Sequence, residues 1–151
     1  MSAKYTASGS QTLTTSATTA LGLTAATASL RRAFIGEFII ADVGTPADNV
    51  VLHTAQRITA AGTATAVTPT KIDPADAASD TVAGENHTAE PTYTASEEVL
   101  EVALNTRATF RWVAAPGFEI VIPATNVNGI GFKALHASAT TDWRVTAAWR
   151  E

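Results

Sequence analysis

FRWVAAPGFEIVIPATNVNGIGFKALHAS, residues 110–138, is the stretch that decides the fold class. Apolar residues occupy alternate positions within it, and Pro116-Gly117 and Asn128-Gly129 interrupt the alternation. A period of two is typical of β-strands, because successive side chains of a strand point to opposite faces of its sheet. Asn128-Gly129 also provides the positive φ angles that a tight hairpin needs. The stretch therefore predicts three strands joined by two turns.

Strand patterns of the same kind extend to both sides of this stretch. Gly36 interrupts one of them and indicates either a bulge or a close approach of another segment. One helical turn is expected at Pro74–Ser79, because Asp73 and Pro74 are a favourable N-cap and first helical residue. Counting gives seven or eight short strands, which predict an all-β, antiparallel sandwich, with a jelly roll as the first choice. The further strand segments are residues 34–40, 50–59, 99–104 and 143–149.

The N-terminal segment has a different composition from the rest of the chain. Residues 6–29 contain 18 Ala, Ser or Thr among 24 positions, and three leucines are the only large apolar side chains. Two interpretations remain open. Residues 1–29 form a weakly ordered arm, or short strands at Thr12–Thr15 and Leu21–Thr24 pair at a sheet edge. Residues 30–151 are expected to form the β-sandwich domain.

The overall composition limits the classes of protein to consider. The 151 residues fit one domain. The chain contains 31 Ala and 25 Thr, compared with only 32 Leu, Ile, Val and Phe together. Without cysteine, disulfides are excluded, and a net charge of −4 gives no support for nucleic-acid or membrane-surface binding. No signal-peptide core or membrane-spanning run is visible, so we expect the chain to be made in a cytoplasm and to stay there or in a particle assembled there.

One face of the later strands collects large apolar residues, including all three tryptophans. A carbohydrate-binding platform would expose such aromatics in a row, but each Trp alternates in phase with aliphatic neighbours, as core residues do. We therefore expect this face to form the sandwich core, with Trp149 as the member most expected to be exposed. The set is Leu100, Val102, Leu104, Phe110, Trp112, Ile120, Ile122, Ile130, Phe132, Trp143, Val145 and Trp149.

Candidate catalytic and metal-binding residues are sparse. His136 falls in phase with the core strands, His53 lies on the strand face opposite Leu52, and His87 is expected in a solvated loop. No two histidines share metal-ligand spacing, and the acidic stretch does not match a calcium loop. We therefore expect no catalytic, cofactor-binding or metal-binding residues, and no enzyme activity. The acidic residues are Asp73, Asp76, Asp80, Glu85 and Glu90.

The opposite strand face is also partly apolar. Several apolar residues on one sheet face suggest a second layer or a subunit contact, and arginines around an apolar centre are typical of interfaces. We expect this outer face to be an interface and the protein to be a homo-oligomer, with a trimer favoured. The candidate interface residues are Ile35, Ile39, Val113, Val121, Leu135, Arg111, Arg144 and Arg150.

The order of segments resembles that of small structural proteins of tailed-phage heads. These segments are the small-residue N-terminus, LRRAFIGEF at 30–38, the acidic PTKIDPADAASD at 69–80, RATFRWVAAPGFEIVIPAT at 107–125 and a final WRE. The resemblance is to decoration, or cement, proteins, which are β-sandwich units that bind the outside of a capsid. It implies a non-enzymatic virion protein located in the phage head, with the major capsid protein as partner. The alternative function is a carbohydrate- or receptor-binding β-module of a phage tail.

Overall fold

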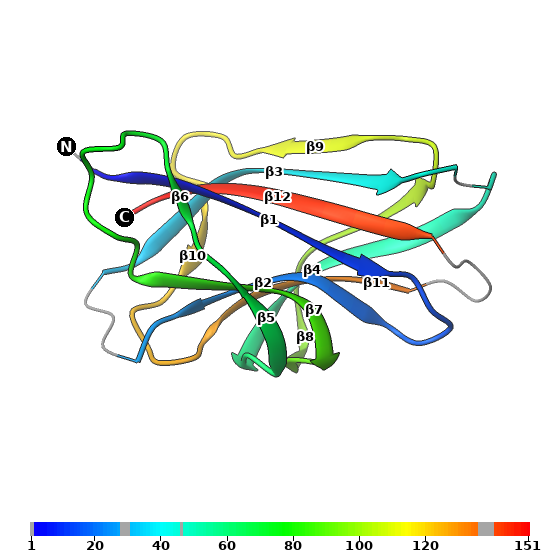
Figure 1. Cartoon of the computed structure of the whole chain (residues 1–151), viewed down its shortest axis with the longest axis horizontal. Coiled ribbons are helices and arrows are strands. Elements are labelled where there is room, and N and C mark those ends of the chain that lie inside the picture. Colours follow the sequence, from blue (N-terminus) through cyan, green and yellow to red (C-terminus); the bar gives the residue numbers. More distant parts are fainter. Residues whose placement is uncertain (1, 28–30, 46, 136–140) are drawn as a thin grey trace.

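The computed structural model describes residues 2–27, 31–45, 47–135 and 141–151. Within these ranges the chain forms twelve strands and no helix. The strands build two antiparallel sheets packed face to face, so the predicted antiparallel β-sandwich is confirmed (Figure 1). A jelly-roll connectivity is not confirmed.

Sheet A has the order β10-β3-β12-β1-β6, and β9 also pairs with β3. Its strands are β1 (Lys4–Thr12), β3 (Ala33–Val43), β6 (Thr70–Lys71), β9 (Phe110–Val113), β10 (Ile120–Ile122) and β12 (Asp142–Arg150). Sheet B has the order β5-β7-β2-β11-β4-β8. Its strands are β2 (Thr18–Ala25), β4 (Val50–Ala60), β5 (Thr63–Val67), β7 (Thr81–Ala89), β8 (Thr92–Asn105) and β11 (Gly129–Leu135).

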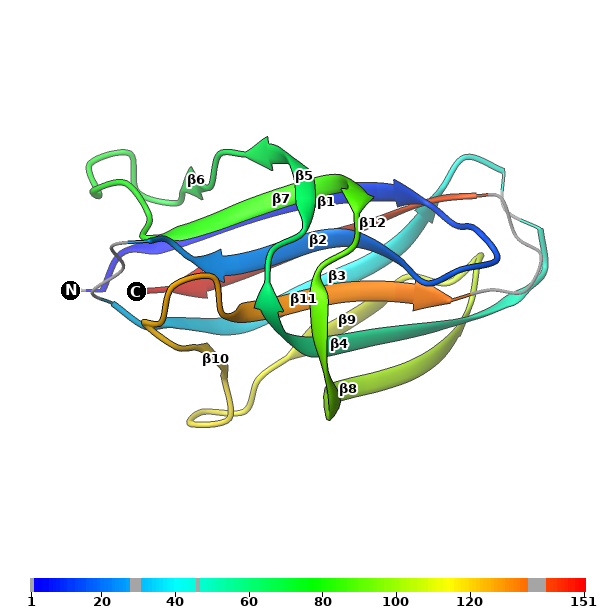
Figure 2. The same ribbon diagram turned by 90° about the horizontal axis from the view of Figure 1, so that it is seen from below.

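A two-stranded ribbon covers the outer face of sheet B. The end of β4 pairs with the start of β8 at Ile58 and Tyr93, and β5 pairs with the end of β7 at Thr63 and Ala89. These paired segments, residues 58–65 and 85–93, cross β2 and β11 from one side of the sheet to the other (Figure 2). We call them the ribbon. Sheet B is therefore covered by sheet A on its inner face and by the ribbon on part of its outer face.

The N-terminal segment is part of the sandwich. β1 pairs with β12 along its whole length, and β2 lies between β7 and β11. The interpretation of residues 1–29 as an arm is therefore wrong. The strand alternative is right only in part: Leu21–Thr24 lies within β2, but β2 is an interior strand and not an edge, and β1 ends at Thr12, so no strand spans Thr12–Thr15. All eight residues of β2 are buried, because a strand between two covering layers exposes neither face.

The stretch at residues 110–138 contains the three predicted strands, but neither connection is a hairpin. β9 and β10 both pair with β3 and run in the same direction along it, so they form one edge strand interrupted by the loop at 114–119. β10 belongs to sheet A and β11 to sheet B, so the chain changes sheets at 123–128. Positive φ angles were predicted for Asn128 and Gly129, but in this connection the positive φ angle lies at Val127 (+58°). Gly129 is needed for another reason, since its Cβ would lie 1.9 Å from the carbonyl oxygen of Leu23.

The predicted bulge at Gly36 is present, and it reverses the faces of the residues before it. β12 pairs Ala148 with Glu37 and Trp149 with Ile35, which leaves Gly36 as an extra residue. Ile35 is consequently 0% exposed in the core, and its prediction as an outward interface residue is wrong. Phe34 points outward instead, where the guanidinium carbon of Arg150 lies 4.4 Å from the centre of its ring.

The core contains most of the apolar face predicted for the later strands. Ile120, Ile122, Ile130, Phe132, Trp143, Val145 and Trp149 are buried. Leu100, Leu104, Phe110 and Trp112 are half-buried and pack against this core, and Val102 is half-buried as well. Trp149 was the expected exception, but its ring is buried and lies 6.0 Å from that of Tyr5. β1 thus adds an aromatic residue to the core that the composition of its segment did not suggest.

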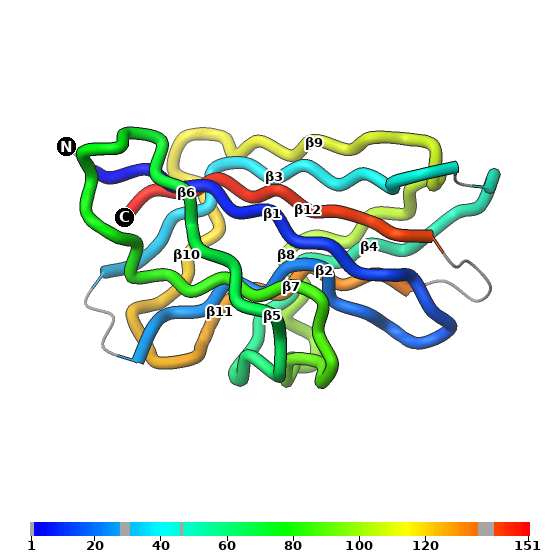
Figure 3. The backbone as a smooth tube through the Cα atoms, in the orientation of Figure 1, coloured from blue at the N-terminus to red at the C-terminus, as the bar shows by residue number. Residues whose placement is uncertain are grey.

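The predicted helical turn at Pro74–Ser79 is a turn without helix. The Asp73 carboxylate accepts a hydrogen bond from the Ala75 backbone N–H, and the Asp76 N–H donates to the Asp73 carbonyl. Asp73 thus stabilises an isolated turn, as Asp side chains commonly do. The loop that contains this turn, residues 72–80, runs past the start of β1 and the end of β12 at one end of the sandwich (Figure 3).

Candidate functional site

The outer face of sheet A brings together most of the predicted interface residues. It carries Ile39, Val113, Val121, Arg111, Arg144 and Arg150. Val113 is 55% exposed, and Phe118 in the neighbouring loop is 78% exposed. Leu135, 46% exposed, follows the buried Ala134 on β11 and lies on the outer face of sheet B. The structure thus separates Leu135 from the other candidates, and it places Ile35 inside the core.

A groove of about 300 Å³ lies on this outer face of sheet A. Ala148 and Gly36 are among the residues that line it, and its large side chains include Phe34, the 59% exposed Ile72 and the core residues Tyr5 and Trp149. Lys4, Glu37, Glu119 and Arg150 add charged groups to its lining. An apolar groove with a charged rim is the usual composition of a protein-binding surface.

Two ion pairs order the charges on this face. Arg111 Nε lies 2.6 Å from Glu37 Oε1 and joins β9 to β3, and Arg150 lies 3.5 Å from Glu119. The hydrogen bond from Arg111 lowers the pKa of Glu37. Arg144 is exposed and forms no ion pair with a described residue. It is therefore a cation of this face that remains available to a partner.

The carboxylates of the acidic stretch are used within the chain. In the described residues, no three His, Asp or Glu side chains are placed to hold a metal ion. Each predicted acidic residue instead has a polar partner on a neighbouring segment or in its own turn. Asp73 accepts from Ala75 N, Asp76 from Lys4 N, Asp80 from Arg31, Glu85 from Ser10 and Glu90 from Thr19.

Glu151 fastens this stretch to the sandwich, a role that the sequence did not indicate. Its carboxylate accepts hydrogen bonds from Ser79 Oγ (2.6 Å), Asp80 N (2.9 Å) and Thr81 N (3.0 Å). Arg31 Nη2 lies 3.4 Å from it. Burial alone raises the pKa of Glu151, but the hydrogen bonds outweigh burial and leave this pKa lowered.

His53 and Asp42 belong to a polar cluster inside the sandwich. His53 is buried on the strand face opposite Leu52, as predicted for the two residues, and its ring lies 5.0 Å from that of Trp143. Asp42 pairs with Trp143 across β3 and β12. One polar atom of each of the three side chains is buried without a hydrogen bond. Burial lowers the pKa of His53 to about 4 and raises the pKa of Asp42 to about 6.

The two shifts have opposite effects on stability between pH 4 and 6. Asp42 binds protons more tightly in the folded state, so its contribution falls as the pH rises from 3.8 to 6. His53 binds protons less tightly in the folded state, so its contribution falls as the pH drops from 6.5 to 4. The two effects largely cancel, which predicts a flat pH dependence of stability for this pair.

Asp42→Asn is expected to reveal both effects. The neutral amide removes the cost of a buried charge, so the free energy of unfolding at pH 7 rises by about 1–3 kcal/mol. With Asp42 gone, His53 titrates alone, and stability drops by about 3 kcal/mol between pH 6.5 and 4. Urea unfolding at several pH values measures both changes. Asp142→Asn on the exposed start of β12 is the control, and equal effects of the two variants would contradict the prediction.

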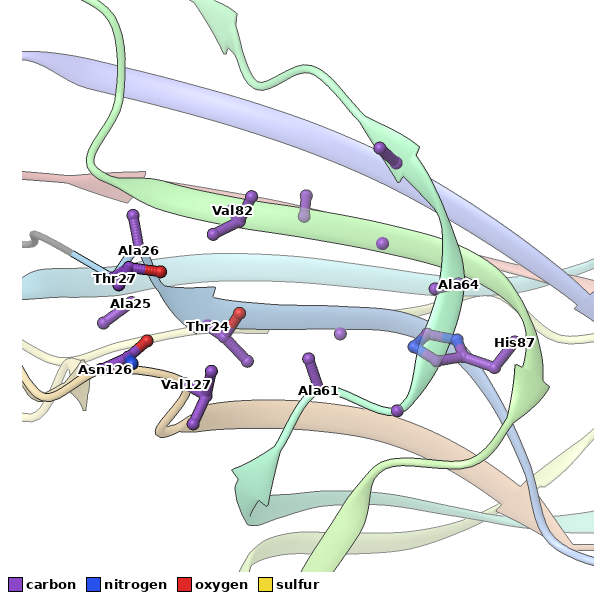
Figure 4. A pocket seen from close by; sticks show the side chains of 15 residues that line it. Thr24, Ala25, Ala26, Thr27, Ala61, Ala64, Val82, His87, Asn126 and Val127 are labelled. Carbon is purple, nitrogen blue, oxygen red and sulfur yellow. The ribbon is translucent and has the colours of Figure 1, made fainter.

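His87 is buried in strand β7, so the prediction of a solvated loop position is wrong. It is 7% exposed, and its Nδ1 lies 3.0 Å from the backbone oxygen of Thr19. The ring borders a pocket of about 250 Å³ between the ribbon and strands β2 and β7 (Figure 4). His136, the third histidine, lies outside the described residues.

Tyr93 anchors the other half of the ribbon. Its hydroxyl lies 2.6 Å from Thr19 Oγ1, and Lys133 Nζ lies 4.6 Å from the centre of its ring. Burial raises the pKa of Tyr93. Gly131 allows this contact, because a Cβ at that position would lie 2.5 Å from the Tyr93 hydroxyl. Glycines in sheet B thus serve to bring the ribbon against the sheet.

Comparison of the chain with protein-family models, curated proteins and solved structures finds no match. In the part of the chain that the structure describes, no helix has the length and apolar character needed to cross a membrane.

Proposed function

We propose that this chain is a non-enzymatic structural protein of a phage virion, which decorates the head by binding the major capsid protein. The outer face of sheet A is the surface that binds. The observation that carries this proposal is the combination of exposed apolar residues with the free cation of Arg144 on a sheet face that none of the described segments covers. The order of sequence segments, which resembles that of capsid decoration proteins, supports the same assignment.

The proposal includes assembly into a homo-oligomer, with a trimer favoured. Val113 and Leu135 are exposed apolar residues on the outer faces of different sheets. A subunit that contacts the capsid through one face can therefore contact a sister subunit through another. Light scattering at high micromolar concentration tests this part, and a clean monomer of 15.6 kDa would contradict it.

The alternative of a carbohydrate-binding tail module receives less support. That function would use exposed tryptophans in a row, whereas Trp143 and Trp149 are buried and Trp112 is half-buried against the core. Mass spectrometry of purified virions separates the two functions. A decoration protein is expected in proportion to the major capsid protein, and a tail module in only a few copies per particle.

Binding to undecorated capsids tests the proposed surface. Val113→Asp combined with Arg144→Glu places two negative charges on the outer face of sheet A, and binding is expected to weaken at least tenfold, or about 1.4 kcal/mol. Leu135→Asp introduces the same kind of change on sheet B, at the proposed contact between subunits, and light scattering of both variants separates loss of assembly from loss of capsid contact. Thermal melting confirms that both variants fold. Equal binding of the double variant and the unchanged chain would overturn the assignment to this face.

A further inference from the structure

The pocket beneath the ribbon is small, mainly apolar and half-enclosed. Its walls come from β2, β5, β7 and the turns at 61–62 and 126–127. Figure 4 shows Thr24, Ala61, Ala64, Val127 and the ring of His87 around the same space. Most of the lining residues are Ala, Gly or Val, so the pocket offers apolar contact area and few polar groups. Apolar walls with one well-placed polar group are the usual composition of a small-ligand site.

His87 supplies a polar atom with a fixed role. The Thr19 backbone oxygen only accepts hydrogen bonds, so the contact of 3.0 Å places the ring proton on Nδ1 of the neutral histidine. Nε2 is then an acceptor, and it forms no hydrogen bond with a described residue. It points into the pocket (Figure 4). Gly22 permits this position, because a Cβ there would lie 3.2 Å from Nε2.

The charge state of the ring agrees with this role. Burial lowers the pKa of His87, although the hydrogen bond to Thr19 and the charge of Glu90 act in the opposite direction. The histidine is therefore neutral at pH 7, and the acceptor on Nε2 is free to bind a donor. Nε2 is not among the fully buried polar atoms that lack a partner, so it is open to the pocket, and a ligand that provides a donor gains one hydrogen bond there.

We propose that this pocket binds a small aromatic group with a single hydroxyl or N–H donor, of the phenol or indole class, and that the donor bonds to His87 Nε2. A volume of about 250 Å³ accommodates one ring or two fused rings. The apolar walls contact the ring, and the pocket lies between the ribbon and strands β2 and β7. This site is separate from the outer face of sheet A and does not depend on the proposed function.

Titration of the whole chain with p-cresol, followed by NMR of the side-chain methyl groups, tests the site. We expect the methyl signals of Ala61, Ala64, Val82 and Val127 to shift together. Toluene lacks the hydroxyl but has a similar shape, and it is expected to bind about tenfold more weakly, because one hydrogen bond is lost. No shift with p-cresol, or equal binding of both probes, would overturn the proposal.

Two variants test separately how the His87 acceptor and the apolar walls contribute to binding. His87→Asn keeps a donor near the position of Nδ1 but removes the acceptor, so p-cresol should bind no better than toluene. Ala61→Leu fills the space from the half-buried turn and should abolish binding of both probes. If either variant fails to fold, the other still gives a result. Unchanged p-cresol affinity in a folded variant would contradict the assigned geometry.

The phenol can come from a free molecule or from a tyrosine side chain of another protein. The peptide acetyl-Gly-Tyr-Gly-amide distinguishes these sources. If the peptide shifts the same methyl signals as p-cresol, the pocket accepts a protein side chain. If only p-cresol does so, the ligand is a free small molecule. Loss of capsid binding in the sheet A variant, with p-cresol binding retained, would show that the two sites act separately.

Discussion

A chain truncated to begin near Ser29 is expected to lose its cooperative fold. The composition of residues 1–29 suggests the opposite result, because small residues contribute little apolar area to a core. In the structure, however, Tyr5, Leu13, Leu21 and Leu23 are among the twelve largest fully buried side chains. Removal of β2 also divides sheet B, since β7 and β11 are both paired with it.

The free energy lost with these core side chains exceeds the total stability of a domain of this size. Truncation of one large core residue to Ala commonly costs 2–5 kcal/mol, and a domain is stable by only about 5–15 kcal/mol. Circular dichroism and thermal melting of the truncated chain measure the result. Leu21→Ala and Leu23→Ala, each expected to fold with a lower melting temperature, provide the graded comparison. A cooperative melt of the truncated chain near that of the full chain would show that β1 and β2 are dispensable.

Gly129→Ala is expected to destabilise the protein by about 3 kcal/mol or more, at the upper end of what overpacking costs. The added Cβ would lie 1.9 Å from the Leu23 carbonyl oxygen and 2.8 Å from Thr24 Cα. Both atoms belong to the backbone of β2, which is buried between two layers and cannot move without disturbing its own pairing. The strands must therefore separate at this point, or the carbonyl must lose its place in the sheet.

Gly36→Ala is the matched control for this substitution. No atom outside the neighbouring residues lies within 4 Å of a Cβ at position 36, and its φ angle is not in the left-handed region. We expect a change in stability below about 1 kcal/mol. Urea unfolding of both variants compares them directly. Similar losses at the two positions would mean that Gly129 is not limited by contact with β2.

The alternation of residues determined the strands of the C-terminal half and the faces of most of their residues. The segment at 143–149 is one example, since Trp143, Val145 and Trp149 are buried there and Arg144 is exposed. Such a pattern can be read locally, because a strand directs successive side chains to opposite faces whatever its partner. The same alternation failed for Ile35, because the bulge at Gly36 shifts the phase by one residue.

For the candidate site, the sequence was enough to predict which residues of β9 and β12 face outward. It was not enough to predict which sheet each strand joins. Asn128-Gly129 has the composition of a hairpin turn, yet the chain changes sheets there. Gly22, far away in the sequence, leaves room for the buried ring of His87, because a Cβ there would lie 3.2 Å from Nε2. Glu151 likewise accepts hydrogen bonds from Ser79 and Thr81, and the local sequence pattern does not predict these contacts.

The sequence by itself thus determined an all-β chain without disulfides and most of the outward-facing residues of sheet A. The exceptions are Ile35, which is buried, and Phe34, which faces outward in its place. The tertiary structure decided the order of the strands, the interior place of β2 and the pocket under the ribbon. The physical reason is that periodicity reports one strand and its two faces, whereas burial on both faces depends on the layers that cover them. The small residues of β2 do not by themselves indicate a core. They are buried because one layer packs against each face of this strand.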